Sequence, residues 1–288
     1  MQDVKAYLAP RRLDEALRAM ATGEATVFCG GTDLAPQTES GARSYQSLLL
    51  NLRRIEALGG IDVTGTEIRI GATTTLSEIR GSSVLTEAAP ALVEAAEHFA
   101  SEQIRNAATI GGNLCNASPA GDTSPPLLVL DAAVELACWR DDAVHKRRVP
   151  LERFFVGPGK TVKLPNELLT RVVFERPPAG FVSRFRKAGP RPALEISTVS
   201  LAFAARVAGG KLSGVRVALG AVAPTPVRAR HVEAALEGKS LDTAAVGAAV
   251  AAIAADAKPI DDVRGSAWYR GHLARVFIEE VLQDVVRN

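Results

Sequence analysis

The sequence predicts an α+β protein, with a mixed α/β region up to about residue 176 and a smaller domain of sheet and helices after it. Three observations support this fold class. Short apolar runs with strand spacing and with helix spacing alternate along the first region. The consecutive prolines Pro177 and Pro178 then favour an extended linker. Beyond this linker, strand patterns come first and helical patterns follow.

In the first region, Leu13, Leu17 and Met20 recur at helical spacing, and Thr75 suits the N-cap of a later helix. The predicted helices cover residues 13–22, 75–81, 89–99 and 125–130. A polar turn at 140–143 predicts a hairpin between the last two strands of this region. The predicted strands cover residues 4–8, 25–29, 47–51, 68–71, 133–139 and 144–149.

In the second region, the glycine pair Gly209-Gly210 predicts a hairpin turn between two long strands. The predicted strands cover residues 181–187, 197–207 and 212–221. The predicted helices, which are rich in alanine, cover residues 232–237, 242–257 and 266–286.

Length and composition exclude several classes of function. The 288 residues suit two or three linked domains. Lys and Arg total 34 against 32 Asp and Glu, and this balance argues against binding nucleic acid through a broad basic face. The 5% aromatic content argues against a stacking platform for single strands. Three scattered cysteines cannot form a zinc knuckle or a four-thiolate iron–sulfur site, and they suit a reducing cytosol.

Neither a targeting signal nor a membrane span is predicted. The N-terminus lacks the basic stretch and the apolar run of a signal peptide. The alanine-rich stretch 244–257 is too short and too weakly hydrophobic to cross a bilayer. The four histidines have no paired-ligand spacing, which favours core or surface roles over metal binding. We therefore expect a cytoplasmic protein that holds no metal of its own.

Two glycine pairs mark the candidate binding site. Gly30-Gly31 lies within residues 28–34, and Gly111-Gly112 lies within a polar stretch that continues to residue 122. Paired glycines permit positive φ and let backbone N–H groups approach a ligand, and a run of such groups suits a pyrophosphate. The side chains that can add donors or acceptors are Thr32, Asp33, Asn113, Ser118 and Asp122.

Other interpretations of these glycines are weaker. A single Gly-Gly is most simply a turn, although two such polar loops favour a phosphate-bearing ligand. Neither loop fits the G-x-G-x-x-G fingerprint, so a nicotinamide cofactor held in the Rossmann manner is not expected. Residues 157–161 end like a Walker A loop, but Phe154 stands where its first glycine is required, so ATP binding is not predicted.

At these residues the sequence resembles a known family. Residues 28–34 and 109–113 look like the two FAD-binding loops of the medium, flavoprotein subunit of molybdenum hydroxylases. This family includes xanthine dehydrogenase and the bacterial carbon monoxide dehydrogenase. The resemblance spans nearly the whole chain, because further matching segments follow in the family's order at 99–106, 154–161, 185–188 and 262–270.

The resemblance implies a PCMH-type FAD-binding domain at 1–176, with α/β subdomains at about 1–58 and 59–176, and a flavoprotein C-terminal domain at 177–288. FAD would lie between the subdomains, with its ring near the C-terminal domain. The residues implied around the pyrophosphate are Phe28, Cys29, Gly30, Gly31, Thr32, Asp33 and Leu34. Those implied along the rest of the cofactor are Ala108, Thr109, Gly111, Gly112, Asn113, Cys115, Ser118 and Asp122.

Four further residues are implied near the flavin ring: Phe99, Ala100, Leu168 and Leu169. A cationic position beside the ring matches Arg186 or Lys187, of which we favour Lys187. A cation there could stabilise the reduced flavin electrostatically. No catalytic side chain is expected on this chain, because FAD would carry the redox chemistry.

The implied function is electron transfer within a heterotrimeric molybdenum hydroxylase, expected as a dimer of heterotrimers. A large molybdopterin subunit would oxidise an N-heterocycle, a purine, an aldehyde or CO. A small subunit with two [2Fe–2S] clusters would feed FAD, which would reduce NAD, a quinone, oxygen or another acceptor. Two alternatives are a stand-alone PCMH-type FAD oxidase, disfavoured by the short chain and by glycine loops without histidine, and a scaffold that binds a nucleotide only for structure.

Overall fold

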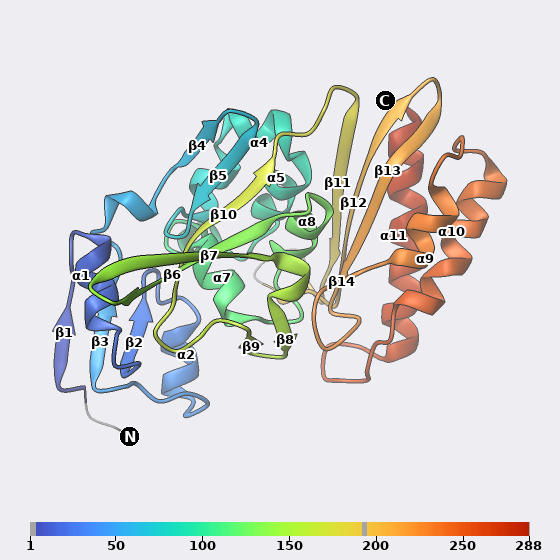
Figure 1. Ribbon diagram of the computed structural model, residues 1–288. Helices are drawn as coiled ribbons and strands as arrows, with labels where there is room; N and C mark the ends of the chain where they lie inside the picture. The colour runs from blue at the N-terminus through green and yellow to red at the C-terminus, as the bar shows by residue number, and fades with distance from the viewer. Residues whose placement is uncertain (1–3, 192–194, 288) are drawn as a thin grey trace.

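The computed structural model describes residues 4–191 and 195–287, and its main sheets lie side by side from the N-terminal to the C-terminal end of the molecule (Figure 1). The N-terminal part consists of β1 (Ala6–Leu8), α1 (Leu13–Ala19), β2 (Ala25–Phe28), α2 (Leu34–Glu39) and β3 (Leu48–Asn51). Its strands are parallel in the order β1-β3-β2. Leu17, Met20 and Leu50 are buried in its core.

The middle part begins after a 3₁₀ turn at Glu56–Leu58 and is built on an antiparallel sheet in the order β4-β5-β10-β6-β7. These strands are β4 (Ile61–Thr64), β5 (Glu67–Gly71), β6 (Ala133–Arg140), β7 (Ala143–Pro150) and β10 (Leu168–Glu175), and a small ribbon pairs β8 (Phe155–Gly157) with β9 (Lys160–Thr161). The helices that pack against the sheet are α3 (Leu76–Arg80), α4 (Ser83–Ala88), α5 (Pro90–Glu97), α6 (Glu102–Arg105), α7 (Ile110–Asn116) and α8 (Ser124–Val129).

The C-terminal part is an antiparallel sheet in the order β11-β12-β13-β14 with helices on its outer face (Figure 1). Its strands are β11 (Phe181–Ala188), β12 (Val199–Ala208), β13 (Lys211–Gly220) and β14 (Val227–Arg228). Its helices are α9 (Arg230–Leu236), α10 (Thr243–Asp256) and α11 (Ala267–Arg287).

This last sheet is buried on both faces. Its side chains alternate between the core of the middle part and the core formed with the C-terminal helices. Phe185, Ala202 and Ala204 pack into the core of the middle part, beside α5 and α8. Leu201 and Phe203 point the other way, into the core formed with α9, α10 and α11. The sheet therefore forms the seam between the middle and C-terminal parts.

The structure confirms the predicted mixed α/β region and the sheet-and-helix region after it. The strands predicted at 133–139 and 144–149 form the β6–β7 hairpin, and Gly209-Gly210 turns between β12 and β13. Thr75 caps α3 through a reciprocal bond with Glu78. No strand was predicted at Leu168–Glu175, which is the central strand β10. This strand is buried on both faces, so it lacks the alternation that marks a half-buried strand.

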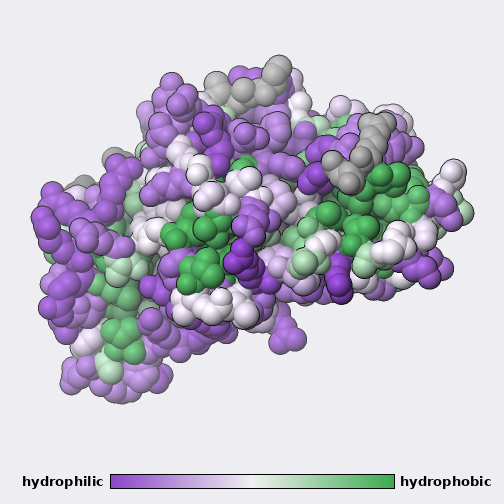
Figure 2. Space-filling model, turned by 90° about the horizontal axis from the view of Figure 1, so that it is seen from above, coloured by the Kyte–Doolittle hydropathy of each residue, from purple (hydrophilic) through white to green (hydrophobic). Residues whose placement is uncertain are grey.

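Within the described residues, no helix combines the length and apolar character that crossing a membrane requires. Seen from above, the surface is mostly hydrophilic, with hydrophobic areas over the middle of the molecule and over its C-terminal side (Figure 2).

Candidate functional site

The first glycine loop, residues 29–33, connects β2 to α2 and carries a run of free donors. In the part of the chain that the structure describes, the backbone N–H groups of Gly30, Gly31, Thr32 and Asp33 donate to no protein acceptor. Gly31 adopts a φ of +70°, which a residue with a Cβ rarely takes. Successive free N–H groups form a concave partial positive charge that suits an anion such as a pyrophosphate.

The second glycine loop, residues 108–113, has a different structure. Gly111 and Gly112 lie in the first turn of α7, whose N-cap Thr109 accepts a hydrogen bond from the Gly112 N–H at 3.1 Å. The N–H groups of Ile110 and Gly111 donate to the carbonyls of Thr74 and Ala72. The expectation that both glycine pairs form runs of free N–H groups is therefore wrong for the second pair, whose donors already serve the fold.

The two loops lie against each other. A Cβ added to Gly30 would stand 2.0 Å from the Ala107 carbonyl oxygen and 3.2 Å from the Ala108 Cα. A Cβ added to Gly111 would stand 2.7 Å from the Ala72 carbonyl oxygen. The glycines thus let three backbone segments approach more closely than side chains would permit, which brings the free N–H groups beside the start of α7.

A hollow of about 590 Å³ opens between the N-terminal and middle parts, next to the first glycine loop. Gln37 on α2 spans the junction, because its Nε2 donates to Asp33 Oδ2 at 2.5 Å and to Asn116 Oδ1 at 3.0 Å. The hollow is lined by Asp33, Gln37, Ala42, Arg43, Cys115, Asn116, Ser118 and Gly159.

Of the residues that line this hollow, five were not among the site residues expected from the sequence: Gln37, Ala42, Arg43, Asn116 and Gly159. Gln37 follows Asp33 by one helical turn, and this spacing is the signal that could have found it. Cys115 and Cys29 are partly buried free thiols, and burial raises the pKa of each. Both thiols are therefore protonated, weak nucleophiles at neutral pH.

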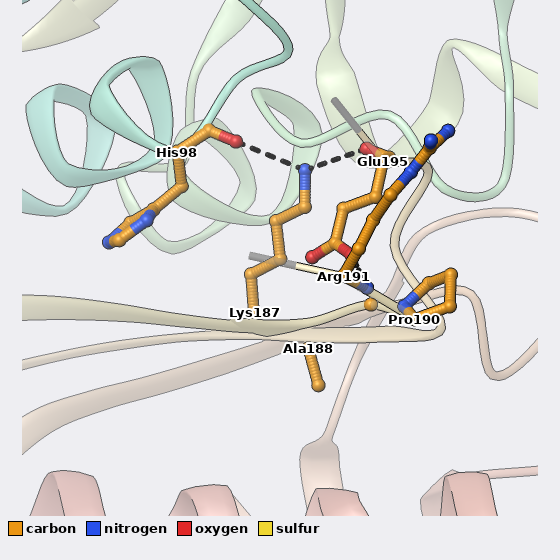
Figure 3. Close-up of a pocket in the computed structure, with 7 residues that line it drawn as sticks. His98, Lys187, Ala188, Pro190, Arg191 and Glu195 are labelled. Atoms are coloured by element: carbon orange, nitrogen blue, oxygen red, sulfur yellow. Dashed lines mark hydrogen bonds between the residues drawn. The ribbon is translucent and has the colours of Figure 1, made fainter. Parts of the chain in front are cut away.

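A second hollow, of about 470 Å³, lies at the seam between the middle and C-terminal parts (Figure 3). The end of β11 and the segment after it supply most of its wall, and His98 at the end of α5 faces them. Lys187 Nζ donates to the carbonyl oxygens of His98 and Glu195, both at 3.2 Å. The wall consists of His98, Lys187, Ala188, Gly189, Pro190, Arg191 and Glu195.

Asp122 joins this second hollow to the polar stretch after α7. Its Oδ2 lies 2.6 Å from Lys187 Nζ, and its Oδ1 accepts a hydrogen bond from Ser197 Oγ at 2.5 Å. Burial raises the pKa of Asp122, although Lys187 and Ser197 act in the opposite direction. Ser197 was not expected from the sequence, because it lies 75 positions away from its partner.

Arg186 and Lys187 point to opposite faces of β11. Arg186 forms an ion pair with Asp284 on α11, whereas Lys187 lies on the same face as Phe185 and reaches Asp122. The alternation of side chains along a strand decides between the two candidates. Among them, only Lys187 reaches the seam.

The remaining predicted residues lie around these hollows in different ways. Ala100 adopts a φ of +40°, and Arg105 fixes this turn by donating from Nη1 to the carbonyls of Phe99 and Ala100 at 2.8 and 3.0 Å. Leu168 and Leu169 are only 4% and 2% exposed in the cores on either side of β10. Their side chains leave little surface for a flavin ring, so their packing on it stays a prediction.

Two further contacts stabilise the polar stretch that follows α7. Thr123 Oγ1 donates to Asn113 Oδ1 at 2.6 Å, and the Ala120 N–H donates to Ser118 Oγ at 3.2 Å. Across residues 4–191 and 195–287, no group of three or more His, Cys, Asp or Glu side chains is arranged to hold a metal ion. The first hollow is therefore lined mainly by polar side chains, next to a loop with free N–H groups.

Comparison with known proteins gives the same assignment for both halves of the chain. Residues 2–176 match the family described as the FAD binding domain in molybdopterin dehydrogenase. Residues 184–285 match the family described as the CO dehydrogenase flavoprotein C-terminal domain. These two matches place the candidate site within the first family and the wall formed by β11 within the second.

Individual relatives match along almost the full length. The chain is 32% identical to the xanthine dehydrogenase FAD-binding subunit of Escherichia coli O157:H7, over 99% of this chain and 97% of that subunit. The carbon monoxide dehydrogenase structure from Hydrogenophaga pseudoflava superposes with a TM-score of 0.90 at 30% identity, covering 97% and 96% of the two chains. Quinoline 2-oxidoreductase from Pseudomonas putida 86 superposes with a TM-score of 0.90 at 25% identity, covering 99% and 98%. The chain therefore belongs to the FAD-binding medium subunits of the xanthine dehydrogenase and carbon monoxide dehydrogenase family.

Proposed function

We propose that this chain carries FAD and transfers electrons within a heterotrimeric molybdenum hydroxylase. The observation that carries the proposal is the run of four free N–H groups at Gly30–Asp33, placed where the N-terminal and middle parts meet. A pyrophosphate satisfies such a run, and the medium subunits to which this chain is similar are FAD-binding subunits.

The residues present fit FAD in an extended position. Gly30–Asp33 would hold the pyrophosphate, and the hollow at Gln37 and Asn116 offers polar side chains to the nucleotide end. The ring would lie towards the seam, beside Phe99, Ala100 and the Asp122–Lys187 pair. When bound, the flavin supplies two-electron redox chemistry, while the chain's own residues position it and shape its electrostatics.

The assembly and the domain bounds belong to the same proposal. Medium subunits of this family work beside a small and a large subunit, for which we propose two [2Fe–2S] clusters and molybdopterin, in a dimer of heterotrimers. The proposed bounds are 1–58 and 59–176 for the two subdomains of the FAD-binding domain and 177–288 for the C-terminal domain. We also propose a cytoplasmic location, in line with the sparse cysteines.

The test is to co-express the chain with its two partner subunits and to record the visible spectrum of the purified complex. We expect flavin absorbance with one FAD per chain, reduced when the substrate of the large subunit is added. Absence of flavin even after reconstitution with FAD would refute the proposal. Turnover of a small alcohol by the isolated chain would instead favour a stand-alone oxidase.

A matched pair of variants tests whether the first loop holds the anion. Gly31→Ala should weaken FAD binding, because the strained φ of +70° turns these N–H groups inward. Gly247→Ala is the control, since this exposed glycine of α10 has open space around it and lies in the C-terminal part. Equal dissociation constants for FAD in the two variants would exclude this loop as the pyrophosphate site.

A further inference from the structure

A fully bonded ion pair crosses the seam beside the second hollow. The side chains of Lys187 and Asp122 are only 3% and 7% exposed, and their charged atoms lie 2.6 Å apart. The ammonium also donates to two carbonyl oxygens, those of His98 and Glu195, so its three donors are all used. The second carboxylate oxygen accepts from Ser197. The pair is therefore held by hydrogen bonds from four separate segments of the chain.

We propose that Asp122 is a positioning residue that fixes Lys187 at the seam and cancels its charge, so that a neutral pair, and not a lone lysine cation, sets the midpoint potential of the flavin. The inference rests on the proposed function, because it places the flavin ring beside this pair. Ser197 orients the carboxylate by donating a hydrogen bond to Asp122 Oδ1, the oxygen that does not contact Lys187.

The charge balance of the buried pair determines the electrostatic field beside it. Opposite charges at 2.6 Å act on a neighbour as a dipole, whose field is weaker than that of a single charge. Removing one partner leaves the other charge buried and uncompensated. If Asp122 is neutralised, the ammonium of Lys187 becomes a net positive charge beside the ring, and it favours the more negative, reduced flavin.

Removal of Lys187 should change the potential less than removal of the Asp122 charge. Burial raises the pKa of Asp122 even with Lys187 in place. Lys187 lowers this pKa, so its removal raises the pKa of Asp122 further and favours a protonated carboxyl without net charge. The other charged or titratable side chains of the hollow, Arg191, Glu195 and His98, are the same in all variants, so changes in potential report on the pair.

The experiment is a redox titration of the flavin in the assembled complex, with FAD content measured for each variant. Asp122→Asn should favour reduction by about tenfold, which is about 30 mV for a two-electron couple. Adding Lys187→Met to this variant should return the equilibrium to within about twofold of the wild type. In Lys187→Met alone, the equilibrium between oxidised and reduced flavin should stay within about threefold of the wild type. This variant provides the test if Asp122→Asn fails to assemble.

Two hydroxyl variants serve as a matched control. Ser197→Ala removes a hydrogen bond to Asp122, whereas Ser200→Ala removes a buried hydroxyl opposite Lys187 that has no partner in the described part of the chain. Only Ser197→Ala should move the potential, and in the same direction as Asp122→Asn.

Two results would overturn the inference. One is an unchanged potential in Asp122→Asn, and the other is a shift of tenfold or more towards the oxidised flavin in Lys187→Met, as expected of a lone cation. A wild-type complex without flavin would instead refute the proposed function, so the two failures are distinguishable.

Discussion

The two glycine loops share the same dipeptide and differ in what the glycines do. In the first loop, Gly31 turns the backbone at a φ of +70° and the following N–H groups stay free. In the second, Gly111 and Gly112 begin a helix whose N–H groups are bonded to Ala72 and Thr109. The first pair therefore leaves a run of free N–H groups, which we propose as the anion site, while the N–H groups of the second pair are used within the fold. A Gly-Gly motif can therefore serve a turn with free N–H groups or a close approach of backbone, and its hydrogen bonds distinguish the two.

The largest effect is expected at Gly30, where the two loops touch. In Gly30→Ala the added Cβ would meet the Ala107 carbonyl oxygen at 2.0 Å, and backbone atoms on both sides must shift. We expect a loss of about 3 kcal/mol in the free energy of unfolding, at the upper end for overpacking. The midpoint of urea unfolding measures it, with Gly247→Ala as the control in open helix. An unchanged midpoint would show that the loops do not touch.

A smaller loss is expected in the second loop. In Gly111→Ala the Cβ would lie 2.7 Å from the Ala72 carbonyl oxygen and 2.8 Å from the Ala72 Cβ. Alanine favours a helix over glycine by about 1 kcal/mol, which offsets part of the overpacking. We expect a net loss of about 2 kcal/mol in urea unfolding. Stabilisation would mean that packing against Ala72 does not require this glycine.

The two loops also show how far the sequence alone can reach. Both glycine pairs were located from the sequence, and both lie within residues 2–176, which match the FAD-binding family. The helix at Ile110–Asn116 was not predicted, because two glycines weigh against a helix by about 1 kcal/mol each. Its contacts with Ala72 and Thr74 overrule this local preference. Local propensity cannot show a bond to a distant carbonyl.

The seam shows a similar division. Lys187 could be singled out by strand alternation with Phe185, which the sequence contains. Ser197 could not, since its bond to Asp122 depends on how two distant segments meet. Gln37 lies between these cases, because its spacing from Asp33 is visible but its bond to Asn116 is not. Positions that follow from strand or helix periodicity could be predicted from the sequence. Contacts between segments that are distant in the sequence could not.

A third, smaller loss of stability is expected at Gly31 in the first loop. Gly31 has no atom within 4 Å of its potential Cβ, so Gly31→Ala meets no clash and only the φ of +70° resists it. We expect a loss of about 1 kcal/mol in urea unfolding. Gly31→Asn should lose less, since asparagine tolerates this conformation better. If asparagine is as costly as alanine, the strain does not arise from φ.

The smallest effect is expected at Gly112, and it tests the second loop from within. In Gly112→Ala the new Cβ would lie 3.0 Å from Thr109 Oγ1, so crowding of the cap opposes a gain in helix propensity of about 1 kcal/mol. We expect a net change within about 0.5 kcal/mol. The Gly112 N–H already bonds to Thr109, so FAD affinity should stay the same, in contrast to Gly31→Ala.

A double-mutant cycle resolves these opposing contributions. Thr109→Ala alone should cost about 1 kcal/mol, the usual value of such a cap. In that background the Oγ1 atom is gone, so Gly112→Ala should stabilise by the full helix gain of about 1 kcal/mol. Urea unfolding of the four proteins measures the coupling. Strictly additive effects would mean that the cap and the glycine act independently, and the close packing assigned to this loop would then rest on Gly111 alone.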